Sequence, residues 1–251
     1  MRVGIYVDAF NVYYGGRGLA NGRRSGWKWL DLVALVEQLI DPMNWPAAEI
    51  SRLVYCSAPR SRTGDSAGSA DQNTYFEALR RVAAARGVEF ECLLGRYVTT
   101  EKSGLLLEGK GGAPVKWSAV QLDEPLPHWL RLRGVQGATG TQGALAQFRA
   151  FEEKGSDVNV ATQLIWDVAT HVVDAAVIFS NDSDLELPAR MARQQVPVGL
   201  VNPTPRYLAK ALRGEASEGP GHHWWRGLSL EDLLKNQLPH SIDDVRKPAD
   251  W

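Results

Sequence analysis

Short apolar segments alternate with amphipathic helical segments along this chain, and no other feature restricts its fold as strongly. Five segments have the length and β-branched composition of buried strands, namely residues 3–7, 53–56, 88–94, 175–180 and 196–201. Apolar residues recur at helical spacing between them, over residues 32–40, 71–86, 157–168 and 184–195. This alternation predicts an α/β fold, with a central parallel sheet and helices on both of its faces.

The chain of 251 residues is long enough to bury one substantial core. We therefore predict one main domain over residues 1–205, with an insertion at about 95–147. Glycines interrupt every periodic run in the insertion, which leaves a hairpin and a mobile arm both open. Residues 206–251 are predicted to form a C-terminal extension with short helices, one of which begins with a capping box of Ser229 and Asp232.

Composition and charge limit where the protein works and what it binds. The formal net charge is only -1, so a site for nucleic acid would have to come from local charge. Cys56 and Cys92 lie in apolar stretches, as reduced buried thiols do in a cytoplasmic protein. Neither a signal peptide nor an apolar run of membrane-spanning length is evident, so we expect a cytoplasmic protein with no membrane partner. Homo-oligomer formation is left open.

Four aspartates are predicted to meet at one edge of the sheet. Asp8 ends the first strand, Asp182 and Asp184 follow the fourth strand, and Asp157 begins the helix before it. Ligands of open parallel sheets bind beyond the carboxyl ends of the strands. Clustered carboxylates either raise their own pKa values or hold a hard cation, which predicts a Mg²⁺ or Mn²⁺ site. Metal-bound water would then attack phosphorus, although each aspartate taken alone also suits a helix cap or a turn.

Polar and aromatic residues near this edge suggest how a substrate would be held. Asn11 would orient a metal-bound water or a phosphate through its amide, or would cap the helix that follows. Cations and aromatic rings together are typical of single-stranded nucleic-acid binding. The residues predicted for this role are Tyr13, Arg17, Arg23, Arg24, Lys28, Arg60, Arg62 and Lys154. In the alternative interpretation, Trp27 and Trp29 pack into the core and the arginines are ordinary surface charge.

Three stretches of the sequence resemble, in order, the signature motifs of the NYN family of PIN-like nucleases, which includes the LabA-like and former DUF88 proteins. They are Val7-Asp8-Ala9-Phe10-Asn11-Val12-Tyr13-Tyr14, Glu153-Lys154-Gly155-Ser156-Asp157-Val158 and Ile178-Phe179-Ser180-Asn181-Asp182-Ser183-Asp184-Leu185. The resemblance implies a PIN-like three-layer fold with strand order 3-2-1-4-5. It also implies Mg²⁺- or Mn²⁺-dependent RNA cleavage, with the catalytic positions matched by Asp8, Asn11, Asp157, Asp182 and Asp184. Asn181 stands where a glycine is usual in the family, and Ala9 stands where a glycine often follows the first aspartate.

The function expected from the sequence is that of a divalent-metal-dependent endoribonuclease acting on single-stranded RNA. The alternative is an RNA-binding or regulatory protein on the same fold, with little or no catalysis. A phosphatase with an aspartyl nucleophile is disfavoured, because Phe10 stands where that chemistry normally places a second acid.

Overall fold

Six parallel strands form the central sheet of the computed structural model, which describes residues 1–23, 25–59, 66–110, 112–116, 132–136 and 142–251. The strands are β1 (Arg2–Asp8), β2 (Glu49–Ser57), β3 (Glu89–Leu94), β7 (Ala175–Phe179), β8 (Val198–Asn202) and β9 (Trp224–Gly227). They lie in the order β3-β2-β1-β7-β8-β9, and each neighbouring pair is parallel. The predicted α/β class with a central parallel sheet is confirmed. The predicted strand order 3-2-1-4-5 is not confirmed as stated, because the tail adds the sixth strand β9.

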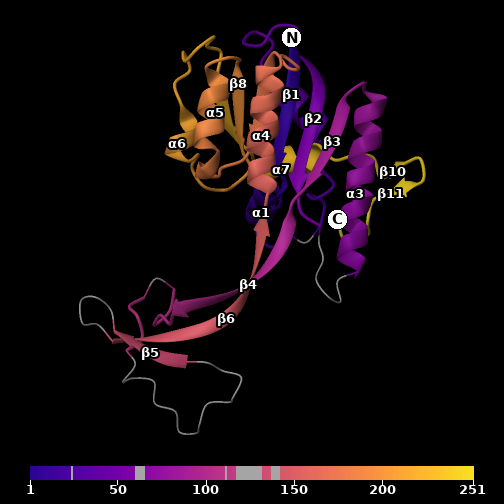
Figure 1. The fold of residues 1–251 in the computed structure, drawn as a ribbon. Helices are drawn as coiled ribbons and strands as arrows, with labels where there is room; N and C mark the ends of the chain where they lie inside the picture. The colour runs from indigo at the N-terminus through magenta and orange to yellow at the C-terminus, as the bar shows by residue number, and fades with distance from the viewer. Residues whose placement is uncertain (24, 60–65, 111, 117–131, 137–141) are drawn as a thin grey trace. The chain divides into compact units, whose positions relative to one another are not determined.

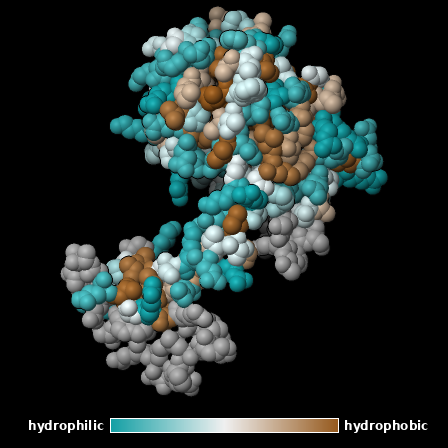
Figure 2. All heavy atoms as spheres, viewed as in Figure 1, coloured by the Kyte–Doolittle hydropathy of each residue, from teal (hydrophilic) through white to brown (hydrophobic). Residues whose placement is uncertain are grey.

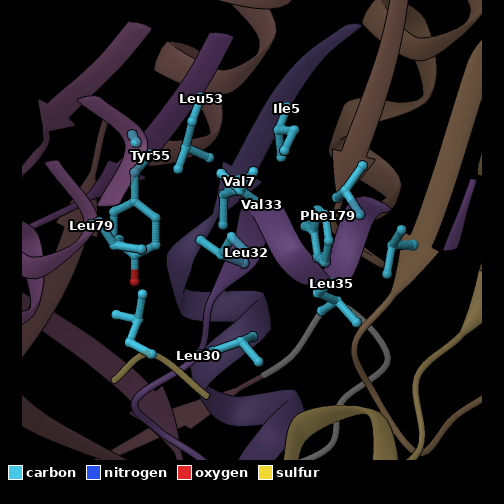
Figure 3. Close-up of a cluster of buried hydrophobic side chains, with 14 of the residues drawn as sticks. Ile5, Val7, Leu30, Leu32, Val33, Leu35, Leu53, Tyr55, Leu79 and Phe179 are labelled. Atoms are coloured by element: carbon cyan, nitrogen blue, oxygen red, sulfur yellow. The ribbon is translucent and has the colours of Figure 1, made fainter. Parts of the chain in front are cut away.

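Helices cover both faces of this sheet, as predicted (Figure 1). One hydrophobic cluster contains residues of α1 (Ala9–Leu19), α2 (Leu32–Leu39), α3 (Ser66–Ala85) and α7 (Leu230–Lys235). The other contains residues of α4 (Ser156–Ala169), α5 (Glu186–Arg193) and α6 (Lys210–Arg213). Alternate residues of a strand point to opposite faces, so Ile5 and Val7 join the first cluster and Tyr6 joins the second. Figure 3 shows Ile5 and Val7 in the first cluster with Leu35 of α2.

The chain divides into two units, which are Met1–Arg96 with Lys154–Trp251 and, separately, Tyr97–Glu153. The second unit contains most of β4 (Arg96–Leu105), with β5 (Leu132–Gln136) and most of β6 (Gln142–Lys154). These strands form a sheet of order β4-β6-β5, in which β5 and β6 are antiparallel. The described part of the insertion thus contains strands.

The C-terminal tail contributes to the first unit. Its strand β9 pairs with β8, and β10 (Ser241–Ile242) forms a small antiparallel pair with β11 (Val245–Arg246). The predicted capping box at the start of α7 is confirmed, because the Ser229 side chain accepts from the Asp232 N–H and the Asp232 side chain accepts from the Ser229 N–H. Part of the tail is therefore built into the main sheet and its helical layer.

Hydrophilic residues cover most of the face of the first unit that Figure 2 displays, with apolar residues in smaller groups between them. Among the described residues, no helix combines the length and apolar composition that crossing a bilayer requires. Both cysteines are free, Cys56 buried and Cys92 half-buried, and they pack on opposite faces of the sheet.

Candidate functional site at the carboxyl edge of the sheet

Asp8 is the last residue of β1 and the N-cap of α1. The residue is 1% exposed. One carboxylate oxygen, Oδ1, accepts the Asn11 N–H at 3.0 Å. The other, Oδ2, accepts from Asn11 Nδ2 at 2.6 Å and from Ser180 Oγ at 3.0 Å. The carboxylate is therefore fixed in place by α1 on one side and by the end of β7 on the other.

Burial raises the pKa of the Asp8 carboxyl, because the charged form loses water at this position. The hydrogen bonds from Asn11 and Ser180 stabilise the charged form and oppose this rise, while the negative charge of Asp182 adds to it. Burial outweighs the hydrogen bonds, so Asp8 takes up a proton more readily than an exposed aspartate does.

The turn after β7 lies next to Asp8. Ser180, which is fully buried, donates to Asp8 and accepts the Asp182 N–H at 3.1 Å. Asp182 caps the short 3-10 helix Ser183–Leu185 and accepts the Asp184 N–H at 3.0 Å. Asp184 itself is exposed. The structure thus brings Asp8, Asn11 and Asp182 together, with Asp184 on the solvent side.

Asp157 lies in the first turn of α4, after Gly155, whose φ of 108° is in the region that favours glycine. Burial raises the pKa of the Cys56 thiol near the end of β2, and the charges of Asp8 and Asp157 both add to that rise. Asp157 is thus electrostatically coupled to the end of β2.

The predicted metal cluster is not formed by these aspartates. Asp8 Oδ2 accepts from both Asn11 and Ser180, Asp8 Oδ1 accepts the Asn11 N–H, and Asp182 caps a helix. Within the parts of the chain that the structure describes, no group of three or more His, Cys, Asp or Glu side chains could hold a metal ion.

The residues predicted to bind nucleic acid lie on several elements of the described chain. Tyr13 and Arg17 are exposed on α1, Arg23 donates to the Ser25 carbonyl, and Lys154 ends β6. Lys28 donates to the Asp250 carbonyl at 3.0 Å and lies over the rings of Trp27 and Trp251. Arg24, Arg60 and Arg62 lie outside the described residues. Trp27 and Trp29 are buried, so the alternative that places both tryptophans in the core is confirmed.

Sequence reasoning missed the loop of residues 203–209, which follows β8. The Asn181 side chain hydrogen-bonds this loop at Thr204, Tyr207 and Ala209, and the Asn181 N–H donates to Asn11 Oδ1 at 3.1 Å. The one signal in the sequence was Asn181 itself, at a position where the resembling family has a glycine.

Comparison with known proteins gives one relative with a named activity. No protein-family model matches the chain. A crystal structure of a protein of unknown function from Vibrio parahaemolyticus RIMD 2210633 is 16% identical, with a TM-score of 0.42 over 92% of this chain and 94% of that one. The 6-hydroxy-3-succinoylpyridine 3-monooxygenase HspA of Pseudomonas putida (strain DSM 28022 / S16) is 30% identical over 272 residues, which cover 100% of this chain and 75% of the relative.

This relative corrects the function expected from the sequence. Its name is that of a monooxygenase, so the predicted metal-dependent endoribonuclease is wrong, and so is its RNA-binding alternative. The predicted Mg²⁺ or Mn²⁺ cofactor, which belonged to the nuclease reaction, is wrong as well. The chain belongs to the family of the 6-hydroxy-3-succinoylpyridine 3-monooxygenase HspA.

Proposed function

We propose that this protein is a monooxygenase that adds oxygen to a hydroxylated heteroaromatic ring, and that the ring is bound at the carboxyl edge of β1 and β7. The observation that carries this proposal is the similarity to a pyridine 3-monooxygenase along the whole chain. The geometry supports it with a buried carboxyl group of raised pKa, held by hydrogen bonds beside the more exposed turn at Asp182.

Asp8 is the group that would exchange a proton with the ring. A carboxyl group whose pKa is raised toward the working pH is an efficient proton acceptor and donor. Removal of a proton from a ring hydroxyl raises the electron density at the carbon opposite to it. In a 6-hydroxypyridine that carbon is carbon 3, the position that the relative's name gives for its reaction. Since Asp8 is 1% exposed, the hydroxyl would reach Oδ1 by direct contact or through one water molecule.

Asn11 and Ser180 would hold the Asp8 carboxyl in position during proton transfer. Both donate to Oδ2, whereas Oδ1 accepts only the Asn11 backbone N–H among the described groups. A carboxylate oxygen has two lone pairs, so Oδ1 keeps an acceptor position for the ring hydroxyl. The site thus separates the oxygen that is anchored from the oxygen that reacts.

Monooxygenation would require two electrons, which a nicotinamide or flavin group would supply. One oxygen atom would insert between carbon 3 and the carbonyl carbon of its substituent, breaking that bond, and the other would leave as water. The turn between β1 and α1 does not fit the pyrophosphate of such a group. In dinucleotide-binding folds this turn is rich in glycine and its N–H groups bind phosphate. Here the Asp8 carboxylate takes the Asn11 N–H, and Gly15 and Gly16 lie later, inside α1. In the proposed function this turn instead positions the Asp8 carboxyl, which exchanges a proton with the ring hydroxyl.

The proposal is tested by assaying the purified protein with 6-hydroxy-3-succinoylpyridine, heavy-isotope-labelled O₂ and NADH or NADPH, with and without added flavin. We expect oxygen uptake and a product with one labelled oxygen atom. The rates of oxygen uptake and of product formation should both be greatly reduced in Asp8→Asn. An unlabelled product would contradict the proposal, and so would equal rates of labelled-product formation by wild type and Asp8→Asn.

We also propose that the fold is the PIN-like fold of the NYN proteins, as a statement about structure and not about activity. The adjacency of β1 and β7 and the placement of Asp8, Asn11 and Asp182 at their ends support it. The test is a crystal structure of this chain compared with an NYN protein. We expect the strands from β3 to β8 to superpose with the same connections; a different connection between β1 and β7 would contradict it.

A further inference from the structure

Asn181 joins the end of β7 to the loop of residues 203–209 through three hydrogen bonds of its side chain. Nδ2 donates to Thr204 Oγ1 and to the Tyr207 carbonyl, each at 3.1 Å, and Oδ1 accepts the Ala209 N–H at 2.7 Å. The φ angle of Asn181 is not positive, so the backbone has no need of the glycine that is usual here in the resembling family. The asparagine therefore adds an anchor for the loop.

The same loop is held a second time by Asn202, which is 2% exposed at the end of β8. Asn202 Oδ1 accepts from Thr204 N at 2.9 Å and from Thr204 Oγ1 at 2.8 Å, while Asn202 Nδ2 donates to the Arg206 carbonyl at 2.6 Å. The Arg206 N–H donates to Thr204 Oγ1 at 3.3 Å. Both backbone groups of Arg206 are thus fixed, whereas its side chain is exposed.

Helix α1 packs closely against the start of the loop. A Cβ atom on Gly15 would lie 2.3 Å from the Pro203 carbonyl oxygen, and one on Gly18 would lie 3.1 Å from the Pro205 ring. Asn11 lies on the same side of α1 as Gly15 and Gly18, one turn earlier, where it contacts both Asp8 and Asn181. The loop, α1 and the proposed ring site therefore form one continuous edge.

This loop brings positive charge close to the acidic edge. Residues 195–214 contain Arg206, Lys210 and Arg213 but no Asp or Glu. Arg206 and Lys210 are exposed, and neither side chain forms a hydrogen bond or ion pair with any residue that the structure describes. Arg213 differs, because its guanidinium lies over the Trp225 ring at 5.7 Å. Asn181 thus stands between two acidic residues, Asp8 and Asp182, and the segment that carries the two exposed cations, Arg206 and Lys210.

We propose that Arg206, together with Lys210, binds an anionic group on the side chain of the substrate, and that Asn181 is a positioning residue that holds this loop beside Asp8. The inference rests on the proposed function and names its substrate class, which is a hydroxylated heteroaromatic ring with a carboxylate side chain. A guanidinium group binds a carboxylate through paired hydrogen bonds. Because the backbone of Arg206 is already fixed, less freedom is lost when the substrate binds.

The test compares two probes that differ in a single carboxymethyl group, 6-hydroxy-3-succinoylpyridine, which carries it, and 6-hydroxy-3-acetylpyridine, which lacks it. In Arg206→Gln we expect KM for the succinoyl probe to rise about tenfold, the loss of roughly one charge-assisted contact, with kcat little changed. KM for the acetyl probe should stay the same. Arg213→Gln is the matched control, and it should leave both probes unaffected. Equal effects of Arg206→Gln on the two probes, or no effect on either, would overturn the inference.

Asn181→Gly tests the positioning role separately. We expect a rise in KM for the succinoyl probe that does not add to the rise in Arg206→Gln when both changes are combined, because Asn181 acts through Arg206. Fully additive effects, or equal loss for both probes, would show that Asn181 is only structural and would refute its role.

Equilibrium binding of the two probes by calorimetry, without reductant, separates this inference from the proposed function. If wild type prefers the succinoyl probe and Arg206→Gln loses that preference while no oxygen enters the ring, the proposed function fails and the anion site stands. If oxygen enters the ring but the preference survives in Arg206→Gln, the inference alone fails.

Discussion

The side-chain amide nitrogen of Asn11 lies 2.6 Å from Oδ2 of Asp8. The oxygen of the same amide accepts the Asn181 N–H at 3.1 Å. One side chain of α1 thus links the end of β1 to the turn after β7. It also defines which way the amide points, since reversing it would leave the Asn181 N–H without this acceptor.

The stability of the protein should depend on pH through Asp8. Burial raises the pKa of Asp8 above its ordinary value, so its contribution to stability is full below a pH of about 3.8 and is lost as the pH rises through the pKa of the folded state. Asp8→Asn removes this loss. The melting temperature of the variant should therefore rise relative to wild type between about pH 4 and pH 8.

The same variant should lose catalysis, with kcat lower by about 100-fold or more, as expected when a group that transfers a proton is removed. Asp184→Asn is the control, because Asp184 is exposed and lies on the solvent side of the turn. For the stability prediction, a difference in melting temperature between Asp8→Asn and wild type that stays constant between about pH 4 and pH 8 would show that ionisation of Asp8 does not cause the pH dependence of stability.

The packing of α1 against the loop after β8 should tolerate no side chain at Gly15. A methyl group there would meet the Pro203 carbonyl oxygen at 2.3 Å, which forces the helix or the loop to move. We expect Gly15→Ala to lower the free energy of unfolding by about 1–3 kcal/mol, the usual effect of overpacking. Urea unfolding followed by circular dichroism measures it. In the control Gly227→Ala the new methyl group meets no atom within 4 Å, so a loss equal to that of Gly15→Ala would refute the explanation.

A buried ion pair joins Arg52 of β2 to Asp167 of α4. Arg52, which is 7% exposed, donates to Asp167 Oδ2 at 2.7 Å, and Asp167 also accepts from Tyr6 at 3.0 Å and from Gln163 at 2.9 Å. Arg52→Met would leave the Asp167 charge buried without its cation, at a cost of about 3–5 kcal/mol. Denaturant unfolding of Arg52→Met measures this loss. The exposed Arg2–Asp174 pair gives the control, and Arg2→Gln should change stability little. Similar losses in both variants would contradict a special cost of burial.

The sequence predicts those elements whose patterns are local. The run from Val3 to Val7 ends at an acid, so the position of Asp8 at the edge of the sheet follows from residues next to it. Strand β9 could not be predicted in this way. Its four residues lie in a glycine-rich tail and form a strand only by pairing with β8. In this pair the Trp224 ring packs on Gly199, where an added Cβ atom would lie 2.2 Å from the ring.

The chemistry of the site was less predictable than its position. The sequence shows that Asp8 and Asp182 reach one edge, but it does not show which partners their oxygens have. Asn11 lies in α1 and Ser180 directly after β7, and the hydrogen bond from Ser180 to Asp8 depends on the register of β1 with β7. Stretches that resemble motifs of metal-dependent nucleases therefore placed Asp8 and Asp182 at one edge, while the reaction inferred from them was wrong.

His223 should make stability depend on pH in the direction opposite to Asp8. The Val198 N–H donates to Nδ1 at 3.0 Å, so the proton of the neutral ring is on Nε2, which lies 2.7 Å from the Glu218 carbonyl oxygen. Burial lowers the pKa of His223, and the positive charge of Arg193 adds to this effect, although the Glu218 carbonyl opposes it.

Stability from His223 is therefore present above its unfolded-state pKa of about 6.5 and is lost as the pH falls through the folded-state pKa, because protonation removes the acceptor for Val198. Urea unfolding of His223→Gln should show a smaller decrease in the free energy of unfolding between about pH 7 and pH 5 than wild type does. His222→Gln, which changes the exposed neighbour, should keep the wild-type decrease. If His223→Gln and His222→Gln have the same pH profile as wild type, the decrease comes from other groups.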